Sequence, residues 1–319
     1  MSDEPVHIVP IAAHGSRLDA FAAGIMGCGV RAAKRLAQAG RILADGKPRP
    51  PHYKLEAGTA VTVSSPAPER SSPEIRLAAA GADYAAFIKP AGLHTAAITG
   101  KASPSLERAI REQWAAFRQS PVFATVPEIS ESLGKNLGGP FSSAPPSPGP
   151  FTQEPPVLLS RLDEATSGLV AAAFTPEAAE AFRAMETAGR AGKYYMAVVH
   201  GTVEHPFCME NALDTDNRKT TRVLPEPNAD STRHTAVTPI PPEGLDIPAL
   251  EPGKTLVAAH IRRGARHQIR AHLAHAGFPI LGDTLYGPDK EPFPLHLHHA
   301  RLVFPGFDAA CFPNWLRIL

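Results

Sequence analysis

The chain has 319 residues, of which 43% are hydrophobic and 20% are charged, and its formal net charge at pH 7 is +1. This length accommodates one large core and a small additional domain, and the composition is that of an ordinary globular protein. A net charge so close to zero excludes a globally basic nucleic-acid-binding protein, so any contact with nucleic acid has to come from local basic patches.

Cysteine usage and the N-terminus bear on the compartment. The three cysteines, Cys28, Cys208 and Cys311, form no CxxC pair, which argues against a disulfide scaffold or a cysteine-rich zinc site and for a reducing compartment. The first residues lack the basic start and apolar core of a signal peptide, and no apolar run approaches the roughly 20 residues of a membrane helix. We therefore expect a soluble, cytoplasmic protein without a membrane partner.

Residues 1–63 are predicted to form a small separate domain. Apolar residues from Leu18 to Ile25 recur at i, i+3, i+4 and i+7, the spacing of one buried helical stripe. A second helix is expected from about 30 to 39, with Gly40 as its stop. Its basic residues share one face because they are three or four positions apart. They are Arg31, Lys34 and Arg35.

Two strands are expected next, at 41–44 and 58–63, with Asp45-Gly46 as a hairpin turn after the first. In the order of its elements, the stretch 15–63 resembles an S4 RNA-binding domain. The resemblance implies that the three basic residues of the second helix contact RNA, and a merely solvated charged face is the alternative. A Ser- and Pro-rich segment at 64–73 is typical of a linker.

Residues 74–319 are predicted to form the second domain. It opens with a strand at 84–88, which is followed by the run Lys-Pro-Ala-Gly-Leu. A helix is expected from Pro104 to Phe117, with Ser103 as its N-cap. The stretch from about 120 to 156 is rich in Pro, Gly and Ser and has too few apolar residues to offset the entropy lost on ordering. We expect it to be a flexible insertion.

Residues 160–168, Ser-Arg-Leu-Asp-Glu-Ala-Thr-Ser-Gly, are expected to form a loop between two apolar runs. An Asp that follows Arg-Leu and precedes Thr-Ser-Gly turn chemistry is hard to explain as a solvated surface carboxylate. The segment resembles the catalytic loop of the RluA-type RNA pseudouridine synthases, usually His-Arg-Leu-Asp-x-x-Thr-Ser-Gly, with Ser160 in place of the His. The resemblance implies that Asp163 is the catalytic aspartate. It also implies that Arg161 fills the space vacated by the target base or binds phosphate.

A helix and a strand follow this loop. Thr175 and Pro176 suit the N-cap and the first position of the helix. Residues 193–201 alternate as a strand and resemble the family's Lys-x-Tyr-x-Ala-x-Val-x-Gly pattern. That register implies that Tyr195, and not Tyr194, is the active-site tyrosine. The alternative is a packing role, because aromatic residues are favoured in strands.

Residues 262–275 are dense in Arg and His and contain no acid, which makes them a positive site suited to phosphates. They resemble the family pattern Gly-Arg-x-His-Gln-Ile-Arg-x-His-Leu, with Ala265 in place of the first Arg. The resemblance implies that Arg270 pairs with the catalytic aspartate. We expect a nearby arginine, Arg263 or Arg266, to take over the missing phosphate contact. The RNA-binding residues predicted in this domain are Arg161, Lys89, Arg263, Arg266, His267 and Gln268.

Two further runs, 279–287 and 297–302, resemble structural motifs of the same family, and all the motifs occur in the family's order. The resemblance implies an α+β fold, the pseudouridine synthase fold, which has a mixed, largely antiparallel β-sheet core with flanking helices. The small S4-like α/β domain would precede it. The implied activity is the isomerisation of specific uridines to pseudouridine in structured RNA, a reaction that needs no cofactor.

The reaction breaks the bond between C1′ and N1, turns the uracil and joins its C5 to C1′. An ionised carboxylate can act as a nucleophile at C1′ or as a base toward a ribose proton, and the sequence leaves both open. Because a partly dry cleft disfavours the charged form of a carboxyl group, a cation must keep Asp163 ionised, and Arg270 is expected to do so. Tyr195 would stack on the uracil, which has to leave its own stack to enter the site.

Two other functions stay open. Six histidines could hold a metal ion in a hydrolase, although no HExxH or paired-carboxylate pattern supports this. They are His267, His272, His275, His296, His298 and His299. The other is a non-catalytic RNA-binding protein that keeps the synthase fold, motivated by Ser160 and Ala265. The expected partner is RNA, with large-subunit ribosomal RNA favoured and tRNA as the alternative, and we expect a monomer without a metal site.

Overall fold

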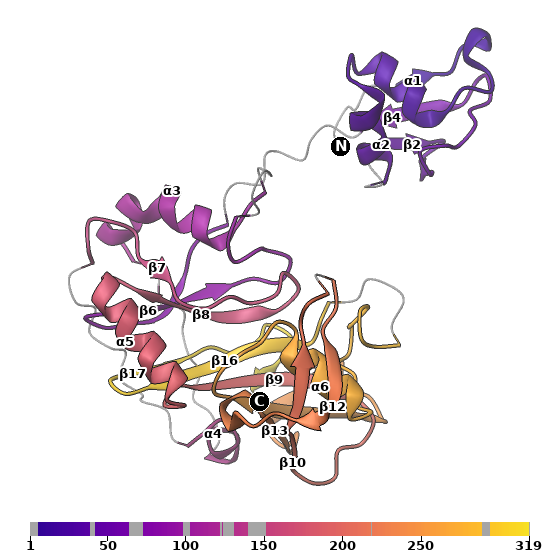
Figure 1. Ribbon diagram of the computed structural model, residues 1–319. Helices are drawn as coiled ribbons and strands as arrows, with labels where there is room; N and C mark the ends of the chain where they lie inside the picture. The colour runs from indigo at the N-terminus through magenta and orange to yellow at the C-terminus, as the bar shows by residue number, and fades with distance from the viewer. Residues whose placement is uncertain are drawn as a thin grey trace. The chain divides into compact units, whose positions relative to one another are not determined.

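The structure, a computed structural model, describes residues 6–38, 42–63, 73–97, 103–121, 123, 131–139, 151–217, 219–288 and 294–318. It divides into two compact units, Met1–Ser71 and Ser72–Leu319 (Figure 1). This division falls within the segment 64–73 predicted as a linker, most of which lies outside the described residues. In the described part of the chain, no helix is both long enough and apolar enough to cross a membrane.

The first unit is a four-stranded sheet with two helices packed on a shared core. Its strands, in spatial order, are β1 (Val6–Ile8), β4 (Ala60–Val63), β2 (Ile42–Ala44) and β3 (Lys47–Pro48). A short 3-10 helix, η1 (Ile11–Ala13), precedes the helices α1 (Leu18–Ile25) and α2 (Val30–Gln38). Leu18 and Ala22 of α1 are buried against Ile42 and Val61 of the sheet, so the predicted stripe faces the core.

The local predictions for this unit hold where the structure describes them. Helix α1 has the predicted bounds, and α2 runs to the last described residue before position 39. Asp45 and Gly46 have φ values of 51° and 72°, the left-handed pair of a type I′ hairpin turn. Arg31 and Lys34 are exposed on α2, whereas the side chain of Arg35 lies outside the described residues.

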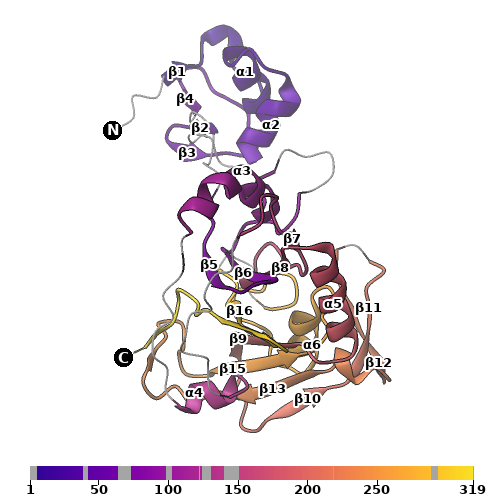
Figure 2. The same cartoon turned by 90° about the vertical axis from the view of Figure 1, so that its left-hand side faces the viewer.

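The second unit is built on a ten-stranded sheet in the order β10-β13-β15-β9-β16-β8-β6-β5, with β17 beside β16 and β7 beside β8. Only β16 and β8 run parallel among its described pairs, so the sheet is largely antiparallel, as expected. Figure 2 shows β16, β9, β15, β13 and β10 side by side. The strands are β5 (Leu77–Ala80), β6 (Tyr84–Lys89), β7 (Val157–Leu158), β8 (Ser167–Ala173), β9 (Gly192–His200), β10 (Phe207–Met209), β13 (Thr235–Pro239), β15 (Lys254–Ile261), β16 (Leu297–Phe304) and β17 (Phe307–Ala310).

Four further strands form two small antiparallel pairs beside the main sheet. One pair is β11 (Asn211–Asp214) with β12 (Arg222–Pro227), and the other is β14 (Leu245–Asp246) with β18 (Arg317–Ile318). A short 3-10 helix, η2 (Ser231–Arg233), leads into β13.

Helices cover both faces of the large sheet, because side chains of a strand point alternately to opposite sides. On one face, Tyr195 of β9 shares a core with Trp114 of α3 (Leu106–Gln119) and with Leu273 of α6 (Gln268–His275). On the other face, Met196 of β9 shares a core with α4 (Glu131–Asn136), and Phe182 of α5 (Pro176–Thr187) packs under β8. Figure 1 shows α3 and α5 on opposite sides of β6 and β8.

Helix α3 begins two residues later than predicted. Its N-cap is Ser105, whose side chain accepts a hydrogen bond from the N–H of Arg108 at 3.2 Å, and not Ser103. Ser105 forms a parallel bridge with His94, which holds its backbone extended and delays the first helical turn. Helix α5 starts as predicted, with Thr175 accepting a hydrogen bond from the N–H of Ala178 at 3.1 Å.

The predicted flexible insertion, 120–156, contains ordered structure. Helix α4 lies within it and buries Leu133, and Leu137 follows in the same core. Arg301 of β16 donates to the carbonyl oxygens of Leu137 at 2.8 Å and Gly139 at 3.0 Å. Most of the rest of the insertion, including 124–130 and 140–150, lies outside the described residues. The prediction of flexibility was therefore wrong for the segment around α4.

Candidate active site

The loop 160–168 that carries Asp163 joins β7 to β8 and is fixed at its backbone. Thr95 Oγ1 donates to the carbonyl oxygen of Leu162 at 2.9 Å and accepts from its N–H at 3.0 Å. Gly168 has φ +112°, and a Cβ there would lie 2.4 Å from a backbone oxygen of β16, so only glycine permits this approach of the two strands. These contacts hold the backbone at Asp163 in place before any ligand binds.

Lys89 fastens a second segment to the same loop. Its side chain is fully buried, and Nζ donates to the carbonyl oxygens of Pro90 at 2.9 Å, Leu93 at 2.7 Å and Glu164 at 3.1 Å. Burial lowers the pKa of Lys89 to about 8, although the negative charges of Asp163 and Glu164 act to raise it. In place of the predicted RNA contact, Lys89 has a structural role, because none of its surface reaches solvent.

The carboxylate of Asp163 faces Arg270, which is itself held by a second carboxylate. Arg270 Nη1 donates to Asp163 Oδ2 at 3.1 Å, while Nε and Nη2 donate to the two oxygens of Asp283, each at 2.8 Å. Asp283 also accepts from the N–H groups of Leu285 and Tyr286, both at 3.0 Å. The bidentate pair fixes the plane of the guanidinium group, so that its remaining edge points at Asp163.

The charges of this network support one another. Burial acts to raise the pKa of Asp283, but hydrogen bonds and charge from Arg270 and the two backbone N–H donors outweigh it and lower the pKa. Burial acts to lower the pKa of Arg270, but Asp283 and Asp163 outweigh it and raise the pKa. Both groups are therefore ionised across the physiological range. Asp163 keeps 23% of its side-chain surface exposed, so of the two carboxylates it is the one that a ligand can reach.

His267 closes the other side of the carboxylate. The Nε2 atom of His267 lies 3.7 Å from Asp163 Oδ2. The backbone of His267 has a φ of +54°, which is uncommon for a residue other than glycine. Its Nδ1 is hydrogen-bonded to the Tyr286 hydroxyl at 2.9 Å, and that hydroxyl also accepts from the N–H of Thr221 at 2.6 Å. Burial lowers the pKa of His267. The negative charge of Asp163 acts to raise this pKa, and the positive charge of Arg270 lowers it further. The ring is therefore neutral at pH 7.

Tyr195 lies on the same face of β9 as this network. Its ring stacks on His299, with centroids 4.5 Å apart and planes 15° apart. Burial, followed by the negative charge of Asp163, raises the pKa of Tyr195, so the phenol stays protonated. Burial also lowers the pKa of His299 to about 3, and its Nδ1 is bonded to the carbonyl oxygen of Leu169 at 2.6 Å. A neutral, fixed imidazole thus supports the back of the Tyr195 ring.

One cleft of about 1210 Å³ is lined by Asp163, Tyr195, His267, Arg270 and His299. Of the predicted site residues, Asp163, Tyr195 and Arg270 meet there, together with Arg161, Arg266, His267 and Gln268. Arg263 does not line it; the side chain of Arg263 lies 3.6 Å from Asp230 instead. The helix α2 residues Arg31, Lys34 and Arg35 belong to the other unit.

Two predicted RNA-binding residues are held by other parts of the protein. Gln268 is buried; its oxygen accepts from the N–H of Ala265 at 2.9 Å, and its amide nitrogen donates to the carbonyl oxygen of Arg233 at 2.6 Å. The guanidinium of Arg266 donates to backbone oxygens of the segment before β12, including Thr215 at 2.5 Å. These bonds shape the loop before α6, and RNA contacts of these two side chains remain predictions.

Both departures from the family motifs are accommodated. Ser160 Oγ accepts from the N–H of Ala171 at 3.2 Å, and the N–H of Ala265 is bonded to Gln268. Neither residue contacts Asp163 through an ion pair or hydrogen bond among the described residues.

The sequence reasoning missed several residues that the structure places at the site. Asp283, in a run taken as structural, holds Arg270. Lys193 is buried at the cleft and forms an ion pair with Glu186. The signal for Asp283 was its place in the Leu-Gly-Asp turn, an acid without a nearby basic residue to pair with in sequence.

The six histidines considered as metal ligands do not form a site. Among the described residues, the side chains that gather within ligand distance of one another are Cys208, Glu210 and His234, none of which is among the six. His272 is bonded at Nδ1 to Thr235 and at Nε2 to the carbonyl oxygen of Asn211. The geometry thus gives the hydrolase alternative no support.

The chain is similar to known RNA pseudouridine synthases. Residues 142–275 match the family model described as RNA pseudouridylate synthase. An RNA pseudouridine synthase from Chloroflexus aurantiacus is 28% identical over 308 residues, which cover 94% of this chain and 83% of the relative. The tRNA pseudouridine synthase C of Vibrio vulnificus is 28% identical over 157 residues, covering 47% of this chain and 60% of the relative.

A solved structure supports the fold. The human RNA pseudouridylate synthase domain containing 1 superposes with a TM-score of 0.52 at 18% identity, covering 76% of this chain and 85% of that chain. It matches the mixed, mainly antiparallel sheet with few helices. The chain is therefore similar in sequence to RNA pseudouridine synthases, with the family model matching 142–275 and one relative aligning over most of the chain.

Proposed function

We propose that the chain converts specific uridines of a structured RNA into pseudouridine, with Asp163 as the catalytic carboxylate. The observation that carries the proposal is the partly exposed carboxylate of Asp163, 3.1 Å from an arginine that the buried Asp283 holds in place. An arginine fixed in this way stabilises the ionised form of Asp163 without covering it. A carboxylate that must react with a ribose needs both properties.

In the proposed reaction, the bond between C1′ and N1 breaks, the uracil turns, and C5 bonds to C1′ while its proton leaves for N1 or solvent. No electrons are gained or lost overall, so the balance needs no oxidant or cofactor. Asp163 acts either as a nucleophile at C1′ or as a base toward a ribose proton. Tyr195 stacks on the uracil as a protonated phenol, with His299 behind its ring.

The target base has to be extruded from its stack, at a cost of about a few kcal/mol. Arg161 supports this step in the proposal, because it is exposed next to Asp163 and lines the cleft. Its guanidinium either fills the vacated space or binds a backbone phosphate. The first unit adds RNA affinity through Arg31, Lys34 and Arg35 of an S4-like domain. Large-subunit ribosomal RNA is the favoured substrate and tRNA the alternative.

The test is pseudouridine mapping on unmodified ribosomal RNA and tRNA after incubation with wild-type protein and with Asp163→Asn. Asparagine keeps the shape of the side chain and removes its charge, so the variant is expected to bind RNA and form no pseudouridine. Arg222→Ala, on the exposed β12, serves as a control that should retain activity. Substantial activity of Asp163→Asn would sink the assignment.

The same experiment decides the alternative of a non-catalytic RNA-binding protein. Tight RNA binding by the wild type without new pseudouridine in any transcript would favour that alternative. Its original motivation was the pair of departures at Ser160 and Ala265, and both are accommodated by backbone hydrogen bonds.

A further inference from the structure

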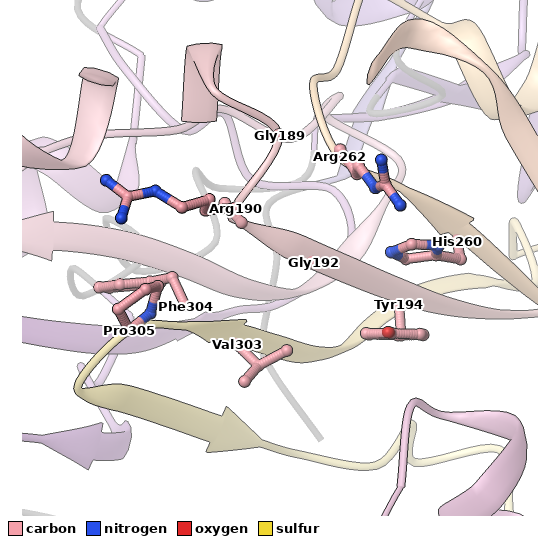
Figure 3. Close-up of a pocket in the computed structure, with 10 residues that line it drawn as sticks. Gly189, Arg190, Gly192, Tyr194, His260, Arg262, Val303, Phe304 and Pro305 are labelled. Atoms are coloured by element: carbon pink, nitrogen blue, oxygen red, sulfur yellow. The ribbon is translucent and has the colours of Figure 1, made fainter. Parts of the chain in front are cut away.

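A second pocket, of about 460 Å³, is lined by residues of β9, β15 and β16 and of the turns beside them (Figure 3). Tyr194 lines this pocket, whereas Tyr195, the next residue of β9, lines the active-site cleft. The same division occurs on β15, where His260 lines the pocket and Ile261 lines the cleft. Because successive residues of a strand point to opposite faces, these two strands form the wall between the cavities.

The charged lining of this pocket is entirely basic. Arg190 and Arg262 are both exposed and lie at its two ends, with Gly192 between them (Figure 3). Neither arginine has an ion pair with another described residue, and no acidic side chain lines the pocket. By contrast, Arg263, the next residue, lies 3.6 Å from Asp230. The two arginines of the pocket are thus available to an anion.

The floor of the pocket is flat and kept open by glycine. The rings of Tyr194 and His260 stack with centroids 4.4 Å apart and planes 17° apart. A Cβ on Gly192 would lie 3.1 Å from the Tyr194 ring and 3.5 Å from His260 Nε2, so the glycine leaves the edge of this stack clear. Burial, and then the charge of Arg262, lowers the pKa of His260. The neutral ring therefore offers one N–H donor at pH 7.

Both cavities meet at the same ends of β9 and β15. The turn 189–192 before β9 lines the pocket, and the loop 262–267 after β15 lines both cavities. In that loop, Arg262 faces the pocket, while Gly264 and Ala265 face the cleft. At the start of β9, Gly192 lines the pocket and Lys193 lines the cleft, so the two cavities share this end of the strand.

We propose that this pocket binds a backbone phosphate of the RNA substrate on one side of the target uridine, with Arg190 and Arg262 as the binding cations. The inference rests on the proposed function and extends its RNA contacts beyond the cleft. Guanidinium groups bind phosphate oxygens through paired hydrogen bonds, and the neutral His260 adds a further donor. Because the net charge of the chain is close to zero, RNA affinity has to come from local basic sites such as this one.

The test compares two double variants that each remove two positive charges. Arg190→Ala/Arg262→Ala alters the pocket. Arg222→Ala/Arg317→Ala is the matched control, because these arginines are 75% and 76% exposed, lie in surface ion pairs and line neither cavity. Affinity is measured against salt concentration with an unmodified transcript in which the wild-type enzyme forms pseudouridine. Each phosphate contact contributes a slope of about −0.7 to −0.9 to log affinity against log salt.

We expect the pocket variant to have a slope shallower by about 0.7 to 0.9, the contribution of one phosphate contact, and to bind roughly tenfold more weakly at fixed salt, with kcat unchanged. The control should match the wild type in slope. Equal slopes for the two double variants would refute the phosphate site and leave the proposed function intact. If the wild type forms pseudouridine in no transcript, the proposed function fails and this inference falls with it.

A calorimetric titration with uridine 5′-monophosphate distinguishes RNA phosphate from a free nucleotide. The proposal expects binding of the mononucleotide at this pocket to be too weak to detect. Binding that only the pocket variant loses, together with an unchanged salt slope for RNA, would assign the pocket to a free nucleotide and overturn the inference.

Discussion

Arg270 is the residue on which the candidate site depends. Its guanidinium bonds two carboxylates at once, the fully buried Asp283 and the partly exposed Asp163. A lone arginine opposite Asp163 would have several rotamers, and each would place its charge differently. Asp283 removes this freedom, so the position of the charge opposite the proposed catalytic carboxylate is set by a buried residue that does not line the cleft.

Asp283→Asn is therefore expected to lower activity without removing any group that lines the cleft. Asparagine presents an N–H donor to the guanidinium in place of one acceptor, which weakens a charge-assisted pair worth about 1.5–3 kcal/mol. We expect kcat to fall about 10- to 100-fold and KM to change little. Rates on an unmodified transcript in which the wild type forms pseudouridine check this, with Asp246→Asn, an acid near Arg317 and outside the cleft, as the control. An unchanged kcat would contradict the positioning role.

The lowered pKa of Lys89 predicts how the free energy of unfolding depends on pH. Its pKa is about 8 in the folded protein, below the ordinary value of 10.5 in the unfolded chain. Between these two pH values the unfolded chain binds more protons, so the free energy of unfolding contributed by this group rises with pH. The cost of burying the charge is present in full below pH 8 and is lost by pH 10.5.

Urea unfolding of the wild type and of Lys89→Met between pH 7.5 and 10.5 measures this contribution. The stability of the wild type relative to the variant should rise with pH across the window, by about 3 kcal/mol at most. The methionine variant removes the titrating group and keeps the chain length, so other groups cancel in the difference. A difference that does not change with pH would disprove the shifted pKa.

At the residue scale, the sequence predicted the site residues that lie within a motif. It missed the residues whose role depends on contacts with other segments of the chain. Asp163, Tyr195 and Arg270 meet in the cleft as their motifs implied. The burial of Lys89 was not predictable, because a lysine beside a turn is by default exposed. Asp283 was taken as structural because its partner lies on a different element and no spacing rule joins the two.

The N-terminus of α3 shows how one bridge between loop residues moves an element boundary. Ser103 and Ser105 both precede the apolar run, and the sequence favoured Ser103 as N-cap because Pro104 suits the first helical position. The bridge to His94 selects Ser105 by holding it extended. The Ser103 hydroxyl is buried without a hydrogen-bond partner among the described residues.

Ser105→Ala is expected to destabilise the protein by about 1 kcal/mol through loss of the cap. Ser103→Ala should change stability by less than about 0.5 kcal/mol, because its hydroxyl caps nothing. Thermal or urea unfolding of the two variants side by side checks this. A larger effect at Ser103 than at Ser105 would return the cap to the residue that the sequence favoured.

The segment 120–156 shows the limit of composition as a guide. The average composition of the stretch is dominated by Pro, Gly and Ser and gives no sign that two of its leucines are buried. Leu133 and Leu137 belong to a hydrophobic core on the sheet. Helix α4 has six residues and is too short to be stable alone. Arg301 holds its C-terminal end by bonding two backbone oxygens, a contact from β16 that no local pattern contains.

On the scale of the whole molecule, the α+β class and the largely antiparallel sheet were predictable because the motifs resemble one family in its own order. The position of each strand in the sheet was not, since it depends on pairings between distant segments. The parallel contact of β8 with β16 joins residues about 130 positions apart. That contact brings the Asp163 loop beside the strand that carries His299.

The two units each have their own hydrophobic core, so residues 72–319 are expected to fold and isomerise uridine without the first unit. If the first unit binds RNA, its removal should raise KM by at least about tenfold, because linked binding modules gain affinity through effective concentration. The value of kcat should be retained. Steady-state kinetics of the full chain and of 72–319 test this, and an unchanged KM would remove the RNA-binding role of the first unit.

The wall formed by β9 has one more consequence. Two tyrosines that are neighbours in the chain present their rings to different cavities, and the only thing that assigns each ring is the pairing of β9 with β15 and β16. A slip by one residue would exchange the two rings between the faces. The register of β9 against β15 and β16 therefore decides which of the two tyrosines lies in the cleft of the proposed uridine site.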